Sequence, residues 1–252
     1  MNTDYNKALI YDANCPLCKA YTGAFVKGGL LKEENRISFS EVNMQQFHID
    51  WHRAKHEIPL INLHTGEVKY GVDALADILQ QKFLFINALL KIRVLNYFFR
   101  KLYKLVSYNR KIIVAAKTPQ TSGIDCTPDY SFVWRWLLII VCYSISNFFI
   151  VTSVARLFGF YNIDLSPWLI LWWMLAPVAI SMVYSKITAT DIHAHVSVTA
   201  TITGFLLLVM SLFIKYFYKV PWLFYLIPAL ILIITLKQCV RRYYFIPYFK
   251  NR

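Results

Sequence analysis

Two cysteines, Cys15 and Cys18, stand directly after a short apolar segment, and this arrangement strongly constrains the N-terminal half of the chain. Residues 7–11 (KALIY) are largely apolar and precede a turn at residues 12–14, a pattern typical of a buried strand. The apolar residues over 15–31 recur at helical spacing, which predicts a helix that ends at or near Gly28-Gly29. The chain must therefore place a pair of thiols where a strand ends and a helix begins.

The chain continues as an alternation of strands and helices up to residue 81. The predicted elements are a strand at 36–42, a helical or irregular segment at 44–57, a strand at 58–63, a hairpin partner at 67–70 and an amphipathic helix at 72–81. With the first strand and helix, the order is β-α-β-α-β-β-α. This order predicts a thioredoxin-like α/β sandwich.

The dithiol has a definite chemistry if it lies at a helix start. A thiolate attacks disulfides, and the unpaired N–H groups and positive dipole end of a helix lower a cysteine's pKa. Cys15 is predicted to be this nucleophile, and Cys18, one turn later, to resolve the mixed disulfide. Pro16 suits the first helical turn, where its missing N–H costs no hydrogen bond. Half of a zinc site and an inert pair remain as alternatives, although no second CxxC follows.

Pro59 is a further candidate site residue, because it opens the strand that follows Ile58. In thioredoxin-like folds a cis-proline at this place faces the dithiol, and cis peptide bonds occur mainly before proline. An ordinary trans proline at a strand edge is the alternative.

Three histidines, His48, His52 and His56, recur every four residues. On one helix they would share a face and could bind a metal ion. The charged residues around them favour a solvated helix instead. We therefore expect no metal site and no cofactor.

Residues 82–117 contain nine Lys or Arg and no acid, interleaved with aromatic and aliphatic residues. A basic, aromatic sequence of helical period is typical of a helix that lies in a membrane interface. The alternative is a helix that packs on the N-terminal domain with its basic face in solvent.

Beyond residue 130 the chain changes character. Four apolar stretches are predicted to span a membrane, near residues 134–154, 167–184, 195–214 and 221–236. Tryptophans near their ends resemble interfacial anchors. Asp191, His193 and His195 are expected in a wet cytoplasmic loop and at the mouth of the third stretch, although ionisable groups at this depth can be functional.

The charge distribution indicates how the chain is oriented in a membrane. The net charge is +13, and twelve of the fourteen acids precede residue 131. The bases cluster beside apolar stretches, which favours anionic lipid and cytoplasmic retention over nucleic acid. No signal peptide is recognisable. We therefore expect a bacterial inner-membrane protein with both termini in the cytoplasm, where dithiols stay mostly reduced.

Several stretches of residues 5–130 together resemble one family. They are Tyr11-Asp12-Ala13-Asn14-Cys15-Pro16-Leu17-Cys18, Ile58-Pro59 through Gly66, Gly71-Val72-Asp73-Ala74-Leu75, Tyr103-Lys104-Leu105-Val106 with Asn109-Arg110, and Asp125-Cys126-Thr127-Pro128. They resemble the DCC family of predicted thiol-disulfide oxidoreductases. The resemblance implies a thioredoxin-like fold and a dithiol at Cys15 and Cys18, with Asp12 as its companion. The family usually has glycine where this chain has Ala13.

These observations predict three regions: a thioredoxin-like dithiol domain (1–82), a basic helical extension and linker (83–130), and a four-helix transmembrane domain with a basic tail (131–252). The expected function is that of a membrane-anchored thiol-disulfide oxidoreductase, with Cys15, Cys18, Asp12 and Pro59 at its site. Its partners would be a thiol or disulfide substrate and membrane lipids. One alternative is a membrane adaptor or lipid-binding protein whose N-terminal domain only docks, and another is a small transporter or electron conduit.

Overall fold

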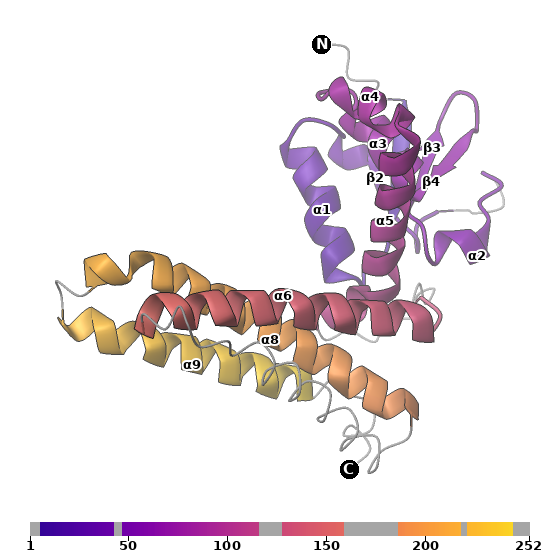
Figure 1. The fold of residues 1–252 in the computed structure, drawn as a ribbon. Helices are drawn as coiled ribbons and strands as arrows, with labels where there is room; N and C mark the ends of the chain where they lie inside the picture. Colours follow the sequence, from indigo (N-terminus) through magenta and orange to yellow (C-terminus); the bar gives the residue numbers. More distant parts are fainter. Residues whose placement is uncertain (1–5, 43–46, 116–127, 159–185, 218–220, 244–252) are drawn as a thin grey trace. The chain divides into compact units, whose positions relative to one another are not determined.

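The computed structural model describes residues 6–42, 47–115, 128–158, 186–217 and 221–243. The chain divides into two compact units, Met1–Ser131 and Phe132–Arg252 (Figure 1).

The N-terminal unit is built on a four-stranded mixed sheet. Its strands are β1 (Lys7–Tyr11), β2 (Arg36–Ser38), β3 (Pro59–Asn62) and β4 (Val68–Tyr70). The strand order is β2-β1-β3-β4; β2 is parallel to β1, and the other two pairs are antiparallel. Gly66 has a φ of 72° in the turn between β3 and β4, a conformation that glycine adopts without strain. The predicted strands are confirmed, although β2 ends at Ser38 rather than at residue 42.

Helices cover the two faces of this sheet. They are α1 (Pro16–Lys27), the 3₁₀ turn η1 (Glu33–Asn35), α2 (Trp51–Ala54) and α3 (Gly71–Leu79). Because successive strand residues point to opposite faces, Leu9 and Leu60 pack with α3, whereas Ile10 and Ile61 pack with α2. The arrangement fits a thioredoxin-like domain. α1 ends at the predicted Gly28-Gly29 pair, because the backbone N–H of Gly28 donates to Ala24 O and caps the helix.

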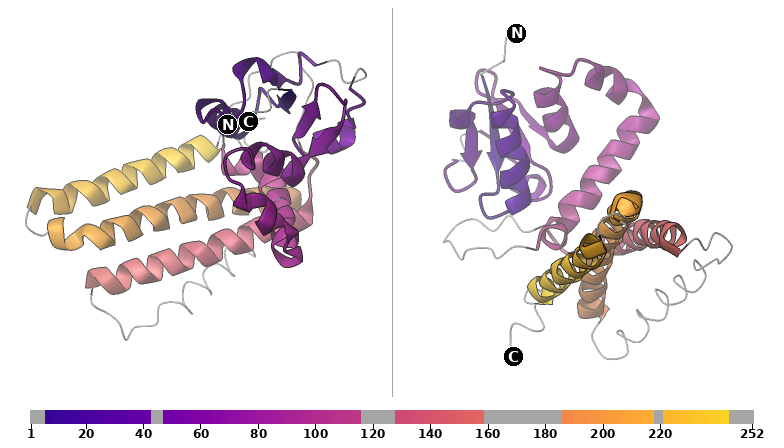
Figure 2. Two further views of the ribbon diagram at one scale, coloured as in Figure 1. Left: turned by 90° about the horizontal axis from the view of Figure 1, so that it is seen from above. Right: turned by 90° about the vertical axis from the view of Figure 1, so that its left-hand side faces the viewer.

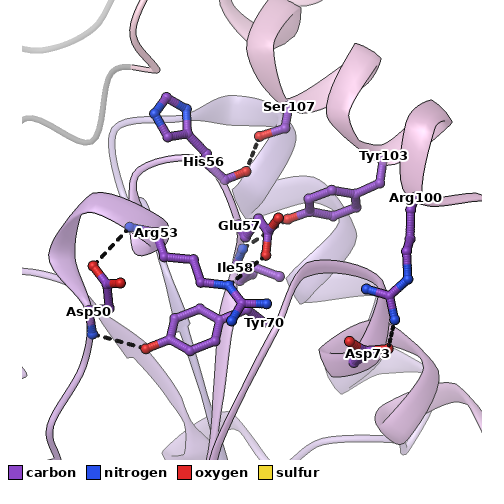
Figure 3. A network of polar contacts seen from close by, with 10 residues as sticks. All are labelled: Asp50, Arg53, His56, Glu57, Ile58, Tyr70, Asp73, Arg100, Tyr103 and Ser107. Atoms are coloured by element: carbon purple, nitrogen blue, oxygen red, sulfur yellow. Dashed lines mark hydrogen bonds and ion pairs between the residues drawn. The ribbon is translucent and has the colours of Figure 1, made fainter.

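The basic segment forms two helices, α4 (Phe85–Lys91) and α5 (Arg93–Ile113), with an extended residue, Ile92, between them. Hydrogen bonds fix α5 to the domain (Figure 3). The backbone N–H of Ile58 donates to Tyr103 Oη at 2.8 Å, and Ser107 Oγ donates to the carbonyl of His56. The helix therefore packs on the N-terminal unit, as one of the two sequence alternatives proposed.

The C-terminal unit contains α6 (Phe132–Phe158), α8 (Lys186–Phe217) and α9 (Pro221–Tyr243). α8 packs against both α6 and α9 (Figure 2). Within the described residues, two segments are long and apolar enough to cross a membrane, Phe132–Arg156 and Thr188–Phe213. The stretch predicted at 167–184 lies outside the described residues, and α9 is helical without meeting this criterion.

The prediction of a wet loop around Asp191, His193 and His195 is wrong. All three residues lie inside α8, and both histidines are buried. Asp191 pairs with Arg135 Nε of α6 at 3.0 Å, and His195 Nδ1 lies 3.3 Å from an Arg242 nitrogen of α9. Their polarity suggested a loop, but partners on the neighbouring helices allow these side chains to be buried.

Candidate active site at the start of α1

Cys15 is the residue that caps the N-terminus of α1. Its backbone is extended (φ −92°, ψ 113°), and the Cys18 N–H donates to its Sγ at 3.4 Å. Pro16 occupies the first turn, and the Cys15 N–H donates to the Asp12 carbonyl at 3.1 Å. The strand, turn and helix start predicted from the sequence therefore place the Cys15 sulfur next to N–H groups of the first helical turn, which have no acceptor within the helix itself.

The surroundings of Cys15 favour its anion. A hydrogen bond from the Cys18 side chain is the largest cause that lowers the pKa of Cys15 to about 6, helped by the Cys18 backbone N–H and by the charge of Arg110. Burial and the Asp12 carboxylate oppose this shift. Cys15 is therefore largely a thiolate at neutral pH, as a nucleophile needs to be.

Cys18 has the opposite character. Its hydrogen bond to Cys15 and its burial both raise its pKa. Both thiols are free and buried, with 6% of Cys15 and 4% of Cys18 exposed. The two sulfurs therefore divide into a thiolate and a protonated thiol, which is the division of roles predicted for an attacking and a resolving cysteine.

Asp12 and Arg110 form a buried ion pair beside the dithiol. Asp12 Oδ2 lies 3.4 Å from Arg110 Nη2, and each side chain is 9% exposed. The other carboxylate oxygen, Oδ1, accepts the Asn14 N–H at 2.8 Å, which holds the turn before Cys15. Arg110 comes from α5 and was not predicted as a site residue. The sequence signal was its place in the Asn109-Arg110 stretch that contributes to the family resemblance.

A small cavity of about 50 Å³ lies beside Cys18. Its lining residues are Ile10, Asp12, Leu17, Cys18, Tyr21, Phe39, Ala54, Ile58, Tyr103, Val106, Ser107 and Arg110. Burial is the main cause that raises the pKa of Tyr21 and of Tyr103, so both phenols stay neutral. The cavity therefore combines one ion pair and the resolving thiol with a neutral, largely apolar wall.

Comparison with known protein families found a match in this region. Residues 9–115 match the model of the family described as DCC1-like thiol-disulfide oxidoreductase. The match confirms the resemblance found in the sequence and runs from β1 to beyond the end of α5, so it includes both cysteines, Asp12 and Arg110. No curated protein and no solved structure matches the chain.

Pro59 lies buried at the start of β3 in the DCC1-like region, where it pairs with Tyr70. None of the peptide bonds in the described residues is cis, so the Ile58–Pro59 bond has the ordinary trans form that the sequence left open. The residue that lines the cavity with Cys18 is its neighbour Ile58. A role for Pro59 at the dithiol site stays a prediction.

The three histidines of the DCC1-like region do not share a helix face. α2 contains His52 but ends before His56, and His48 has a φ of 50° outside any helix. His56 stacks on Tyr108 with ring centroids 4.6 Å apart, and its Nε2 lies 3.0 Å from Asp129 Oδ2. Among the residues that the structure describes, no group of three or more His, Cys, Asp or Glu is placed to hold a metal ion.

Proposed function

We propose that the protein is a membrane-anchored thiol-disulfide oxidoreductase that uses Cys15 and Cys18 on the cytoplasmic face. The observation that carries this proposal is the position of Cys15 at the start of α1, where the Cys18 thiol and N–H lower its pKa to about 6. A family match to thiol-disulfide oxidoreductases over residues 9–115 supports it.

In the first step, the Cys15 thiolate attacks one sulfur of a substrate disulfide. A bond forms between Cys15 Sγ and that sulfur, the substrate S–S bond breaks, and the other substrate sulfur leaves as a thiolate that takes up a proton. The Arg110 charge, which favours both cysteine thiolates, is placed to stabilise negative charge on the protein's sulfurs during the exchange.

In the second step, Cys18 resolves the mixed disulfide. The main cause of its raised pKa is the hydrogen bond to Cys15, which is lost once that sulfur is no longer anionic. Cys18 then loses its proton more easily, with the Asp12 carboxylate beside it as a candidate acceptor. Its thiolate attacks Cys15 Sγ and releases the second substrate thiol, so two electrons pass from the dithiol to the substrate. The reverse steps transfer a disulfide to the substrate.

Membrane attachment is the second part of the proposal. It is supported by the two helical segments that are long and apolar enough to span a bilayer, Phe132–Arg156 and Thr188–Phe213. The cytoplasmic location rests on the clustering of bases beside the apolar stretches.

Trapping with Cys18→Ser tests the redox function. The variant keeps the nucleophile and lacks the resolving sulfur, so mixed disulfides should accumulate on the full-length protein in cells. They should appear on non-reducing gels and disappear with reductant, whereas Cys15→Ser and the double variant should show none.

Cys239→Ser provides the matched control, because Cys239 is an exposed free thiol outside the site. Its removal in the Cys18→Ser background should leave the trapped species unchanged. Partners that bind every variant equally, without a covalent bond, would instead support the adaptor function.

A further inference from the structure

A large apolar groove lies beside the dithiol cavity in the N-terminal unit. Its volume is about 530 Å³, within the range of roughly 300–1,000 Å³ that is usual for small-molecule sites. The lining residues are Leu17, Tyr21, Phe25, Val72, Leu75, Ala76, Leu79, Phe85, Ile86, Leu89, Leu90, Phe99, Leu102, Tyr103 and Val106, from α1, α3, α4 and α5. With no charged side chain among them, the lining suits a hydrocarbon.

The groove adjoins the redox site. Leu17, Tyr21, Tyr103 and Val106 line both the groove and the small cavity that contains Cys18. The two spaces therefore share a wall, and a ligand in the groove would lie next to the resolving cysteine.

The outer surface of α4 and α5 is unusual for a helix pair in water. Large apolar side chains are strongly exposed there, among them Leu84 (83%), Val94 (75%) and Tyr97 (64%). Nine large apolar residues between Phe83 and Val106 are exposed, and such a concentration is typical of a surface that meets a partner or a membrane.

Positive charge surrounds these apolar groups. Seven exposed bases lie on or beside the two helices: Lys82, Lys91, Arg93, Arg100, Lys101, Lys104 and Lys111. No acid occurs between residues 78 and 124, and Arg100 pairs with Asp73 of α3 at 2.6 Å. Each base near anionic lipid adds electrostatic attraction, so the surface favours phosphate head groups.

We propose that the groove binds one acyl chain of an anionic phospholipid from the bilayer to which the protein is attached. The apolar lining receives the hydrocarbon, and the bases of α4 and α5 hold the phosphate. The inference rests on the membrane attachment proposed above, but not on the reactivity of the dithiol.

Photo-crosslinking tests this proposal on the full-length protein in phosphatidylcholine nanodiscs, where no detergent competes for the groove. The probe is phosphatidylglycerol with a diazirine in one acyl chain, and mass spectrometry locates the crosslinks. We expect saturable crosslinks on the groove-lining residues of α3, α4 and α5. Unlabelled phosphatidylglycerol should displace the probe more effectively than phosphatidylcholine does.

A matched pair of leucine variants tests the site itself. Leu102 lines the groove and is 42% exposed, so Leu102→Glu can place a carboxylate there without opening the core. Crosslinking at the groove should fall about tenfold or more, because a charge is costly to bury beside hydrocarbon. Leu63→Glu makes the same change at a leucine that is 45% exposed and lies outside the lining, on neither α4 nor α5, and it should leave the crosslinking unchanged. Leu102→Trp and Leu63→Trp repeat the comparison with a bulky apolar side chain, should the carboxylate disturb folding.

Two results would overturn the proposal. In the first, α6 and α8 are labelled but the groove carries no saturable crosslink. Membrane attachment would then stand, and the lipid would be excluded as the occupant of the groove. The other is equal labelling of the groove in Leu102→Glu and Leu63→Glu. Loss of labelling from α6 and α8 as well would count against membrane attachment.

Discussion

At the scale of single residues, one hydrogen-bonded pair of thiols gives two different reactivities. The Cys18 thiol lowers the pKa of Cys15 by donating to its sulfur, and the same bond raises the pKa of Cys18. Because each shift depends on the other sulfur, removing one thiol should change the titration of the remaining one. Two buried cysteines without this hydrogen bond would titrate independently of each other, so the dependence distinguishes a coupled dithiol from such a pair.

The pH dependence of Cys15 alkylation tests this coupling. In a Cys239→Ser background, the rate of reaction with iodoacetamide should rise with a midpoint near pH 6. Cys18→Ala should move the midpoint upward, because it removes the largest cause of the lowered pKa. Arg110→Gln should also move it upward, by less. A midpoint that stays the same in Cys18→Ala would contradict the proposed hydrogen bond.

The same shift has a consequence for stability. A thiol with a lowered pKa in the folded protein stabilises the fold fully above its unfolded pKa, about 9.0, and loses this contribution as the pH falls through about 6. Between pH 9 and pH 6, the free energy of unfolding should therefore fall more for the natural protein than for Cys15→Ala.

Sequence reasoning located the local part of this site and missed the distant part. Cys15, Cys18 and Asp12 belong to one strand–turn–helix unit, so short-range patterns place them together. Arg110 lies 98 residues from Asp12 along the chain, and no local period indicates that α5 returns to the start of α1. Its contribution depends on tertiary packing, which sequence patterns do not specify.

At the scale of elements, α5 determines one wall of the site. Tyr103 anchors it by accepting the Ile58 N–H just before β3 (Figure 3). Gly71 leaves room for the Tyr103 ring. A Cβ at Gly71 would lie 3.3 Å from Tyr103 Cε1, and its φ of 60° also favours glycine. Ile58 and Tyr103 both line the Cys18 cavity, so this hydrogen bond holds two of its walls together.

Tyr103→Phe tests this anchor. It removes one acceptor and leaves the part-buried Ile58 N–H without its partner, so we expect a loss of about 1–3 kcal/mol in the free energy of unfolding. Tyr97→Phe, on the same helix with a 64% exposed side chain, is the matched control and should change stability by less than about 0.5 kcal/mol. Equal effects from the two substitutions in chemical denaturation would show that α5 is not anchored through Tyr103.

The elements themselves were predicted with uneven success, for physical reasons. The strands and their hairpin were predictable because apolar alternation and a glycine turn are local properties. The division of 82–117 into α4 and α5 at Ile92 was not, since Ile92 has no helix-breaking chemistry of its own. The start of α8 was placed too late because Asp191 and His195 are polar, and their buried partners on α6 and α9 lie far away in the sequence.

At the scale of the whole molecule, charge and hydropathy divide the chain at about the same place. Twelve of the fourteen acids precede residue 131, and the helical segments apolar enough to span a membrane follow it. Along the sequence, the boundary between the two compact units lies between Ser131 and Phe132. For the membrane-anchored protein proposed above, a reducing compartment for the dithiol depends on which side of the membrane the N-terminal unit occupies.

Labelling from the two sides of the membrane tests this orientation. Bases are concentrated before the first apolar stretch and in the tail after residue 236, whereas only Arg156 lies near the first predicted external loop. Because positively charged flanks are retained in the cytoplasm, single-cysteine labels at residues 1 and 252 should both resist an impermeant maleimide in intact spheroplasts. A label between Arg156 and Asp164 should react. Permeabilised cells give the matched control, in which all three positions react.

The opposite orientation would change the redox chemistry. If the label at residue 1 reacts in intact cells, the dithiol faces an oxidising compartment. The reduced Cys15 thiolate assumed for the first step would then need a separate source of electrons.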